Sequence, residues 1–597
     1  MEKEGALNIL GLSFDYHDSA AALLVEGQVV AAAQEERFTR KKYDEVFPSH
    51  AIDACLEMAG LKMTDIDHVA YYEEPMMKFD RILYGVVRAL PGSRDYLGQT
   101  LASWFKRGKF DVKKRIMEYT GLPADRVHLV RHHQAHAASA FFCSGFDQAA
   151  VVTLDGVGEY DTASISLGRG TKLRQIKSVR YPDSIGLFYS ALTAFLGFKV
   201  NSGEYKVMGM AGFGQPRYRD LMYKMIRPVK GGFKLDQSYF SFFAPRELPY
   251  SPRLVEMLGP PREPESPFDV GDLSQPAPPG SEQEKCRHYA DIAASLQLVT
   301  EEIILDFVRY AVKRTGLKQV AMAGGVALNS VANGRLLREL GLDLYVQPAA
   351  GDAGGSLGAA LYFHCCRAGQ PRPRPLDNVY LGRRYQDEDV RRALKEAAVD
   401  TWEYVDDFDR LAHQVAGLLK EGAVIGWFQD RFEWGPRALG CRSILGNPGR
   451  ADMQRIINEK IKFREPFRPF APAVLAERAT EFFDMPQPTS RLQPENYMLA
   501  VWNIKPEARK RIPAVTHVDG TGRVQLVWKE QNPGFRRLIE AFEEQTGLPV
   551  LLNTSFNRRG EPIVNTPDDA LTTFMWSGLD YVVINNFLVK KQEVINL

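Results

Sequence analysis

Short apolar runs alternate with polar or glycine-containing turns along the first part of the chain. The runs with the length and composition of strands are residues 8–13, 20–25, 28–33, 149–154, 320–323 and 344–348. A polar tip at 15–19 separates the first two runs, and residues 295–313 have the apolar periodicity of a helix. Strands that alternate with helices predict an α/β fold with mixed sheets.

Two proline-rich segments interrupt this pattern. Ten prolines indicate an irregular insertion at about 245–280. The stiff segment GQPRPRP at 369–375 is the predicted domain boundary. We therefore expect one domain at 1–370 and a second, also built of helices and strands, at 376–597. No internal repeat is visible.

The overall composition is that of a globular protein whose charges balance. Of 597 residues, 45% are hydrophobic and 25% charged, and 75 basic against 74 acidic side chains leave a formal charge of +1. A protein that coats nucleic acid or anionic membrane needs a basic excess, so neither partner is expected. Six scattered cysteines without a CxxC pair, an acidic N-terminus and the lack of a long apolar run predict a soluble cytoplasmic protein.

The segment HHQAHAASAFF suits a helix and brings histidines onto one face. His132 and His136 are four residues apart, so their rings can grip one ion, and His133 with His136 is an alternative pair. Asp155 follows a strand and Asp352 lies in a glycine-rich turn, which is where α/β folds present ligands. Two imidazoles with carboxylates suit Fe(II), Zn(II) or Mn(II). The simpler interpretation is a chance histidine cluster on a solvated face, with the aspartates as turn residues.

Three glycine-rich turns follow predicted strands. They are DGVG at 155–158, AGGVALN at 323–329 and GDAGG at 351–355. Such glycines let a ligand approach the backbone closely, although a glycine pair by itself is typical of any tight turn. The P-loop sequence and the dinucleotide fingerprint are both missing. Three such turns, two of them carrying a carboxylate, resemble the actin-like ATPase architecture, which clamps a nucleotide between two lobes.

In the second half of the chain, arginines stand among proline and aromatic residues. Examples are WGPRALG, which contains Arg437, and IKFREPFRPF, which contains Arg464 and Arg468. Neighbours of that kind tend to be buried, and a buried guanidinium needs an anionic partner such as a phosphate or carboxylate ligand. Internal pairing with Glu433 or Glu465 is the alternative, and Arg464 in particular could be structural.

Several longer motifs resemble one enzyme family. The nodulation-type O-carbamoyltransferases have similar motifs in the same order over nearly the whole chain: FDYHDSAAALL, AAAQEERFTRKK, HHQAHAASAFF, TLDGVGEYDTAS, NSGEYKVMGMAGFG and AGGVALNSVANG. Those enzymes place carbamoyl groups on hydroxyls of antibiotics, toxins and Nod factors. The resemblance implies an N-terminal two-lobed actin-like ATPase (ASKHA) fold, similar to tRNA threonylcarbamoyl transferase, and a C-terminal YrdC-like α/β domain.

The resemblance also implies roles for individual residues. The implied ligands of a metal that is usually assigned as iron are His132, His136, Asp155 and Asp352. The residues implied for a pocket that binds carbamoyl phosphate and ATP, with Mg²⁺ accompanying ATP, are Arg437, Lys462, Arg468, Arg523, Asn553 and Ser555. Those implied for a nucleotide in the N-terminal domain are Gly156, Glu204, Gly324, Gly325 and Asn329.

The reaction implied by the family has two stages. In the C-terminal domain, carbamoyl phosphate and ATP give carbamoyl-adenylate, with Lys462 and Arg468 as catalytic cations. In the N-terminal domain, the metal polarises the carbamoyl carbonyl and a hydroxyl of a small-molecule natural product attacks it. His17, in the polar tip, is the candidate base, with Asp18 orienting it. A simple hydrogen-bonding role of His17 in the turn is the alternative.

Other functions stay open at this point. A tRNA threonylcarbamoyl-type transferase needs a basic tract for the RNA backbone, and residues 37–42 (RFTRKK) are the main exposed candidate. A nucleotide-gated protein of actin-like fold without chemistry does not need the histidine pair, and a plain metallohydrolase leaves the C-terminal domain without a role. The acceptor, the loaded metal, the part played by His133 and the oligomeric state, a homodimer among others, are left open.

Overall fold

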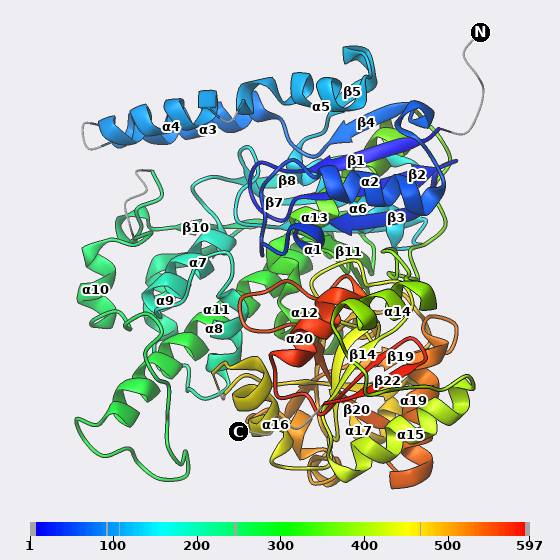
Figure 1. Ribbon diagram of the computed structural model, residues 1–597. Helices are drawn as coiled ribbons and strands as arrows, with labels where there is room; N and C mark the ends of the chain where they lie inside the picture. Colours follow the sequence, from blue (N-terminus) through cyan, green and yellow to red (C-terminus); the bar gives the residue numbers. More distant parts are fainter. Residues whose placement is uncertain (1–6, 91–92, 107, 244–247, 466, 592–597) are drawn as a thin grey trace. The chain divides into compact units, whose positions relative to one another are not determined.

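The chain folds into two compact units (Figure 1). The computed structural model describes residues 7–591 except 91–92, 107, 244–247 and 466. Unit 1 comprises Met1–Val30, Glu45–Pro48 and Ala59–Pro375. Unit 2 comprises Ala31–Asp44, Ser49–Met58 and Leu376–Leu597. Two N-terminal segments thus belong to the same unit as the C-terminal part of the chain.

The first sheet of unit 1 is built around a central strand, β1 (Ile9–Ser13), whose residues are all buried. It pairs antiparallel with β2 (Ala20–Val25) and parallel with β4 (His68–Tyr71). β3 (Gln28–Gln34) and β5 (Val127–Leu129) complete the order β3-β2-β1-β4-β5. The strands predicted at 8–13, 20–25 and 28–33 are therefore confirmed.

The second sheet of unit 1 repeats this connectivity. Its order is β12-β11-β6-β7-β8, with β6 antiparallel to β7 and parallel to β11. The strands are β6 (Gln148–Leu154), β7 (Asp161–Arg169), β8 (Lys172–Arg180), β11 (Gln319–Ala323) and β12 (Asp343–Val346). In each sheet a three-strand meander precedes two strands parallel to its first strand. This doubled topology is that of the actin-like ATPase fold, so the expected fold class is confirmed, although no repeat is visible in the residues themselves.

Two helices meet almost backbone to backbone in unit 1. α13 (Asp352–Leu361) packs against α6 (His132–Cys143) and against β1. A Cβ atom at Gly358 would lie 1.9 Å from the carbonyl oxygen of Ala135, and one at Gly11 would lie 2.0 Å from that of Ser356. Glycine is therefore required where α13 touches its neighbours.

The helix α13 also begins earlier than the sequence predicts. The sequence predicts a glycine-rich turn at 351–355, but the helix begins inside this segment, at Asp352. Gly354 and Gly355 have low helix propensity, which tertiary packing overrides because both residues are buried. A Cβ atom at Gly354 would lie 2.0 Å from the carbonyl oxygen of Ala349, and one at Gly355 would lie 2.6 Å from the ring of Tyr72. The earlier start places the Asp352 carboxylate in the first turn of the helix.

The proline-rich insertion is less irregular than expected. It contains α10 (Pro252–Leu258), in which Pro252 occupies the first turn, where the missing N–H removes no hydrogen bond. The expectation that prolines exclude regular structure is wrong for this stretch. The helix predicted at 295–313 is confirmed and longer, because α11 (Glu282–Thr315) begins after Ser281, whose hydroxyl accepts a hydrogen bond from the backbone N–H of Glu284.

Other helices and a small hairpin surround the two sheets of unit 1. They are α3 (Pro75–Arg88), α4 (Arg94–Lys106), α5 (Val112–Thr120), α7 (Ile185–Phe195), α8 (Glu204–Ala211), α9 (Arg219–Met225), α12 (Ser330–Leu340), β9 (Ile226–Val229) and β10 (Gly232–Leu235). α8, α9 and α12 pack along the long helix α11. They frame the turns that follow β6 and β11.

Unit 2 is a mixed α/β structure. Its large sheet has the order β13-β22-β21-β14-β15-β20-β16-β19. These strands are β13 (Trp402–Tyr404), β14 (Ile425–Phe428), β15 (Arg442–Gly446), β16 (Ala471–Leu475), β19 (Gln525–Val527), β20 (Val550–Ser555), β21 (Tyr581–Ile584) and β22 (Phe587–Lys590). α15 (Phe408–Glu421) and α19 (Pro533–Thr546) pack together over an apolar core that includes Trp427. The likeness to a YrdC domain stays a prediction.

Shorter elements complete the described part of unit 2. A small ladder joins β17 (Val501–Asn503) to β18 (Thr521–Arg523), and a π-helix spans Ile457–Lys462. Helices lie at α14 (Asp387–Glu396), α16 (Met453–Ile456), α17 (Ala479–Phe482), α18 (Pro506–Arg509) and α20 (Pro567–Met575).

The N-terminal segments of unit 2 contain α1 (Glu36–Thr39) and α2 (Ser49–Ala59). Arg37 is only 3% exposed and donates to the carbonyl oxygen of Gly435 at 3.0 Å. Arg40 donates to the carbonyl oxygens of Pro562 and Ile563. Residues 37–42 were expected to be the main exposed basic tract; the two arginines instead anchor the segment within unit 2, whereas the side chain of Lys41 is exposed.

Replacing Gly358 by alanine should destabilise the protein. The added methyl group would collide with the backbone of α6, and such overpacking costs about 1–3 kcal/mol. Gly98 in α4 is the matched control, because a Cβ there meets nothing within 4 Å and Gly98→Ala should be neutral or stabilising. Urea unfolding of the two variants checks this, and equal midpoints for both would contradict the close packing.

Candidate functional site

Four side chains converge in unit 1, among the residues that the structure describes. His132 and His136 lie one turn apart on α6, Asp155 follows β6, and Asp352 is the first residue of α13. One potential ligand atom of each lies within 4.8 Å of the others. Asp155 is 9% exposed and the other three are more deeply buried. We refer to these four residues as the tetrad.

The two imidazoles of the tetrad face each other. Their Nε2 atoms are 3.0 Å apart, and that of His132 lies 3.1 Å from Asp155 Oδ2 and 3.6 Å from Asp352 Oδ1. His136 Nε2 lies 3.7 Å from the same Asp352 oxygen. Two nitrogen lone pairs at this distance repel each other unless a proton or a cation lies between them. The four residues therefore fit a divalent metal ion, and the donor set suits Fe(II), Zn(II) or Mn(II).

The charges of the tetrad also favour a cation. Burial alone lowers the pKa of His132, but Asp352 and Asp155 raise it to about 9. Burial opposes ionisation of the two aspartates, yet His132 holds the pKa of Asp155 well below its usual range. His17 and His132 lower that of Asp352 to about 2 despite burial. The protein thus keeps two buried carboxylates ionised at neutral pH.

Neighbouring groups orient the tetrad. The backbone N–H of Gly325 donates to Asp155 Oδ1 at 2.8 Å, and the hydroxyl of Tyr72 donates to Asp352 Oδ2 at 3.3 Å. Such outer partners fix the direction of ligand lone pairs. His133 is turned elsewhere, with its Nδ1 2.6 Å from the hydroxyl oxygen of Thr153. Of the two pairs that the spacing allowed, the structure brings together His132 and His136.

His17 lies beside the tetrad, in the turn between β1 and β2. Its Nδ1 is 3.0 Å from Asp18 Oδ2 and its Nε2 is 3.9 Å from Asp352 Oδ2. Burial lowers the pKa of His17, but Asp352 and Asp18 outweigh this and raise it to about 9. Nε2 of His17 thus lies next to a tetrad carboxylate, and the raised pKa keeps the ring protonated at neutral pH as long as the charge of Asp352 is not offset.

A second cluster, in unit 2, is positively charged. Its members are Arg437, Lys462, Arg464, Arg468 and Arg523, and we refer to it as the cationic cluster. Burial, followed by the charges of Arg464 and Arg468, holds the pKa of Lys462 well below its usual range. Burial is also the largest cause that lowers the pKa of Arg523 well below its usual range, and the charge of Arg437 is the next. Cations kept this close together need an anionic ligand to offset their repulsion.

Lys462 is held rigidly in the cationic cluster. It is 3% exposed, and its Nζ donates to the side-chain oxygen of Asn557 at 2.8 Å and to the backbone oxygens of Asn557 and Ser555. These acceptors are neutral, so the hydrogen bonds fix the ammonium group without cancelling its charge. Asn557 is a member of this site that sequence reasoning missed, although it stands in the same NTSFN run as Asn553 and Ser555.

Internal pairing, the alternative for the arginines, holds for part of the set. Arg468 lies 3.3 Å from Glu465, as that alternative expects. Glu433 is instead occupied by backbone N–H groups, including those of Leu439 and Cys441 at 2.7 Å. It shapes the WGPRALG loop. Arg464 donates to the side chain of Asn458 and lies over the ring of Phe470, which gives it a structural role.

Comparison with known proteins assigns the chain to a family. A profile described as Carbamoyltransferase N-terminus matches residues 8–361, and one described as Carbamoyltransferase C-terminus matches residues 416–591. The chain belongs to the carbamoyltransferase family. The expected resemblance is thereby confirmed, and the protein is an enzyme of the transferase class.

Two relatives illustrate the breadth of the family. The chain is 42% identical to the uncharacterized protein sll1178 of Synechocystis sp., over 98% of this chain and 97% of that protein. It is 37% identical to the nodulation protein NolNO of Sinorhizobium fredii, over 96% of this chain and 79% of that protein. Among solved structures, HypF of T. kodakarensis matches 61% of this chain and 49% of that chain, with 14% identity and a TM-score of 0.31.

The glycine turns predicted to contact a nucleotide lie at the ends of β6 and β11. Gly324 has a φ of 96° and lies against the carbonyl of Leu154, and Gly325 bonds to Asp155, so this turn adjoins the tetrad. The carbonyl oxygen of Gly156, in the turn after β6, accepts a hydrogen bond from Ser184. Of the three glycines, Gly156 is the one at which an added Cβ would meet nothing within 4 Å, and nucleotide binding at these turns stays a prediction.

The two other residues predicted for this nucleotide have local partners. Asn329 caps α12 by accepting from the N–H of Ala332, and its side chain also bonds to Gln297. Glu204 begins α8 and accepts from the hydroxyl of Ser190. Their part in binding a nucleotide stays a prediction as well.

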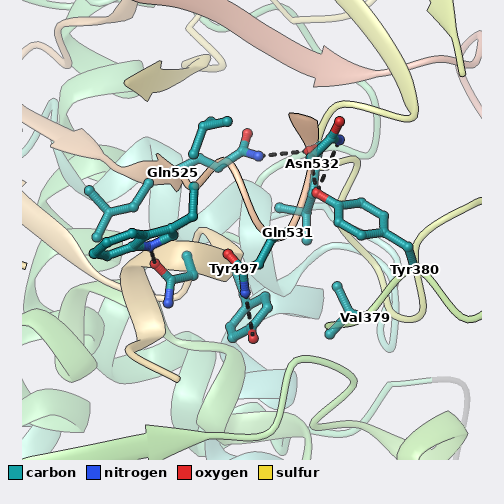
Figure 2. Close-up of a pocket in the computed structure, with 11 residues that line it drawn as sticks. Val379, Tyr380, Tyr497, Gln525, Gln531 and Asn532 are labelled. Atoms are coloured by element: carbon teal, nitrogen blue, oxygen red, sulfur yellow. Dashed lines mark hydrogen bonds between the residues drawn. The ribbon is translucent and has the colours of Figure 1, made fainter. Parts of the chain in front are cut away.

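A small cavity in unit 2 is lined by Gln525 and by aromatic residues that include Tyr380 and Tyr497 (Figure 2). Tyr380 donates to the carbonyl of Leu439, and Asn532 donates to the hydroxyl of Tyr380 at 3.3 Å. The lining groups thus satisfy one another, and the volume of about 10 Å³ suits one water molecule. The cavity is a packing feature and not a substrate site.

Among the described helices, none has the length and apolar character needed to cross a membrane.

Removing His136 should abolish tight metal binding. Loss of an outer-shell partner of a metal ligand costs about 10–100-fold in affinity, and loss of a ligand costs at least as much. The metal content of purified His136→Ala, measured by elemental mass spectrometry, should fall accordingly. His133→Ala is the matched control, because His133 lies on the same helix but outside the tetrad. Equal metal loss in both variants would argue against the tetrad.

Proposed function

We propose that the protein is an ATP-dependent O-carbamoyltransferase that works in two stages. Unit 2 converts carbamoyl phosphate and ATP into carbamoyl-adenylate, and unit 1 transfers the carbamoyl group to a hydroxyl of a small-molecule natural product. The observation that carries the proposal is the opposite charge of the two sites. Buried cations gather in unit 2, while buried carboxylates gather with histidines in unit 1.

The first stage suits the cationic cluster. Carbamoyl phosphate reacts with water to give carbamate and phosphate, and a carbamate oxygen then attacks the α-phosphorus of ATP, which releases pyrophosphate. The substrates bring about two and about four negative charges, which Lys462, Arg468, Arg523 and the Mg²⁺ of ATP would offset. Because Lys462 is already fixed by neutral acceptors, its charge needs no reorganisation during the reaction. Arg437 and Ser555 belong to the same proposed pocket.

The second stage suits the tetrad. A divalent cation held by His132, His136, Asp155 and Asp352 would neutralise the carboxylates and polarise the carbamoyl carbonyl. The same cation would offset the charge of Asp352, which is the main cause of the raised pKa of His17, and so leave Nε2 free to accept a proton. The acceptor hydroxyl then attacks the carbamoyl carbon, its proton passes to Nε2 of His17, and AMP leaves. Asp18 holds the opposite nitrogen of the ring and so directs Nε2 towards the site. The glycine turns at Gly156 and Gly325 are the proposed contacts of the nucleotide portion.

A transferase that modifies tRNA, the alternative function, has less support. It requires an accessible basic tract along which the RNA backbone can lie. Arg37 is buried and Arg40 is hydrogen-bonded to backbone carbonyls, so the two arginines of the tract expected at 37–42 are engaged within unit 2, and its exposed Lys41 lies 3.6 Å from Asp44. We therefore favour a small-molecule acceptor.

Formation of the adenylate can be tested without any acceptor. Purified protein with ATP, Mg²⁺ and carbamoyl phosphate should produce carbamoyl-adenylate and pyrophosphate, detected by mass spectrometry. Lys462→Ala should slow this by about 100-fold or more, because a fixed cation at the reacting phosphates is lost. Lys460→Ala, an exposed lysine two residues earlier, is the control and should be unaffected. Production of ADP instead of AMP would refute the first stage.

Transfer to the acceptor should depend on His17. In His17→Asn the side chain can still hydrogen-bond but cannot accept the proton, and general-base loss slows a reaction by about 100- to 10,000-fold. Adenylate formation in the same variant should stay at the wild-type rate and serves as the internal control. If transfer from supplied carbamoyl-adenylate to a hydroxyl compound is equally fast in wild type and variant, His17 is not the base.

A further inference from the structure

Several acceptor atoms of unit 2 lie buried without a hydrogen-bond partner in the part of the chain that the structure describes, and two of them belong to residues held next to the cationic cluster. These two are Nε2 of His517 and Oδ1 of Asn553. Phosphate binding does not explain either atom, because a lone pair repels a phosphate oxygen. Buried acceptors are normally satisfied, so the ligand of this region must itself carry hydrogen-bond donors.

A relay of hydrogen bonds fixes the tautomer of His517. The hydroxyl of Thr521 donates to Asp519 Oδ1 at 2.7 Å, since a carboxylate can only accept. The same hydroxyl oxygen must then accept from Nδ1–H of His517, which lies 3.0 Å away. Nε2 therefore carries a lone pair and no proton. Burial lowers the pKa of His517, and the charge of Arg523 lowers it further. Asp519 opposes both effects, and the pKa is about 4, which keeps the ring neutral.

A second relay fixes the side-chain amide of Asn553. Gln525 donates through Nε2 to the carbonyl of Leu439 at 2.8 Å, a bond visible in Figure 2, so its oxygen must face Asn553. That oxygen accepts from Asn553 Nδ2 at 2.7 Å. Asn553 Oδ1 consequently points away from Gln525, although the residue is only 1% exposed.

The two relays stand on either side of Arg523. Thr521, Arg523 and Gln525 occupy alternate positions of the extended stretch formed by β18 and β19, and residues two apart on such a stretch point the same way. Thr521 holds His517, and Gln525 holds Asn553. Nε of Arg523 is also buried without a partner among the described residues. The residues that hold the two acceptors thus flank Arg523, whose charge also acts on His517.

A ligand that fits this arrangement needs a negative charge next to N–H donors. Carbamoyl phosphate has both, because its amide carries two N–H groups close to its phosphate. Acetyl phosphate has nearly the same shape and charge but a methyl group in place of the amide. We propose that His517 Nε2 and Asn553 Oδ1 accept the N–H groups of the carbamoyl amide and thereby select carbamoyl phosphate over other acyl phosphates. This inference rests on the proposed first stage.

The amino group of adenine is the other N–H₂ group that the substrates would bring. We favour the carbamoyl amide because the residues that hold the two acceptors, Thr521 and Gln525, stand on either side of Arg523, which is a member of the cationic cluster. Inosine triphosphate, which has a carbonyl in place of the adenine amino group, separates the two sources experimentally.

The test compares donors in the assay without acceptor. Wild type should release pyrophosphate much faster with carbamoyl phosphate than with acetyl phosphate. His517→Phe keeps the ring but removes Nε2, and Asn553→Leu removes Oδ1. Each should lower kcat/KM for carbamoyl phosphate by about 10- to 100-fold and leave that for acetyl phosphate unchanged or higher. The preference for ATP over inosine triphosphate should not change.

A measurement on the wild-type protein does not depend on how the variants fold. With histidines labelled by ¹⁵N, the Nε2 resonance of His517 should show a bare nitrogen and move towards the hydrogen-bonded position on adding carbamoyl phosphate, but not acetyl phosphate. An unchanged donor preference in both variants, or an unmoved resonance, overturns the inference. A changed preference for ATP assigns the acceptors to adenine and overturns it as well. If wild type itself releases no pyrophosphate with carbamoyl phosphate, the proposed first stage has failed instead.

Discussion

The contact between α13 and α6, where no side chain separates the two backbones, fixes the geometry of unit 1. Gly358 lies against the carbonyl of Ala135, and in the same two helices Asp352 faces His132 and His136. Metal–ligand distances tolerate deviations of only about 0.2 Å. A helix displaced by a methyl group would therefore carry the carboxylate out of reach of the imidazoles, so the packing and the chemistry of unit 1 depend on the same glycine.

Unit 2 faces the opposite physical problem. Lys462 and Arg523 are buried near further arginines, and burial of like charges opposes folding. The hydrogen bonds of Lys462 go to the neutral oxygens of Asn557 and Ser555, which keep its charge available to an anion. A carboxylate in their place would stabilise the empty site and compete with the substrate. An anionic ligand that binds only the folded state must then stabilise unit 2.

Much of unit 1 could be predicted because it depends on local patterns. Apolar runs predicted the central strands. The i,i+4 spacing of His132 and His136, together with Asp155 and Asp352 in turns after strands, predicted the tetrad. The pairing of His132 rather than His133 with His136 could not be decided, because it depends on which face of α6 meets Asp155. The early start of α13 and the assignment of residues 31–44 to unit 2 depend on contacts between distant segments. The bare acceptor on His517 depends on a relay through Thr521, which no spacing reveals.

The charges of the two sites suggest why the proposed reaction proceeds from unit 2 to unit 1. Carbamoyl phosphate and ATP together bring about six negative charges, whereas carbamoyl-adenylate retains about one after phosphate and pyrophosphate have left. The cationic cluster therefore loses most of its attraction for the intermediate as soon as it forms. The intermediate keeps its carbonyl oxygen. This oxygen can bind a cation, but it has no favourable interaction with the carboxylates alone. A metal ion in the tetrad would supply the cation that this oxygen needs, so we expect metal loading to be a condition for the second stage.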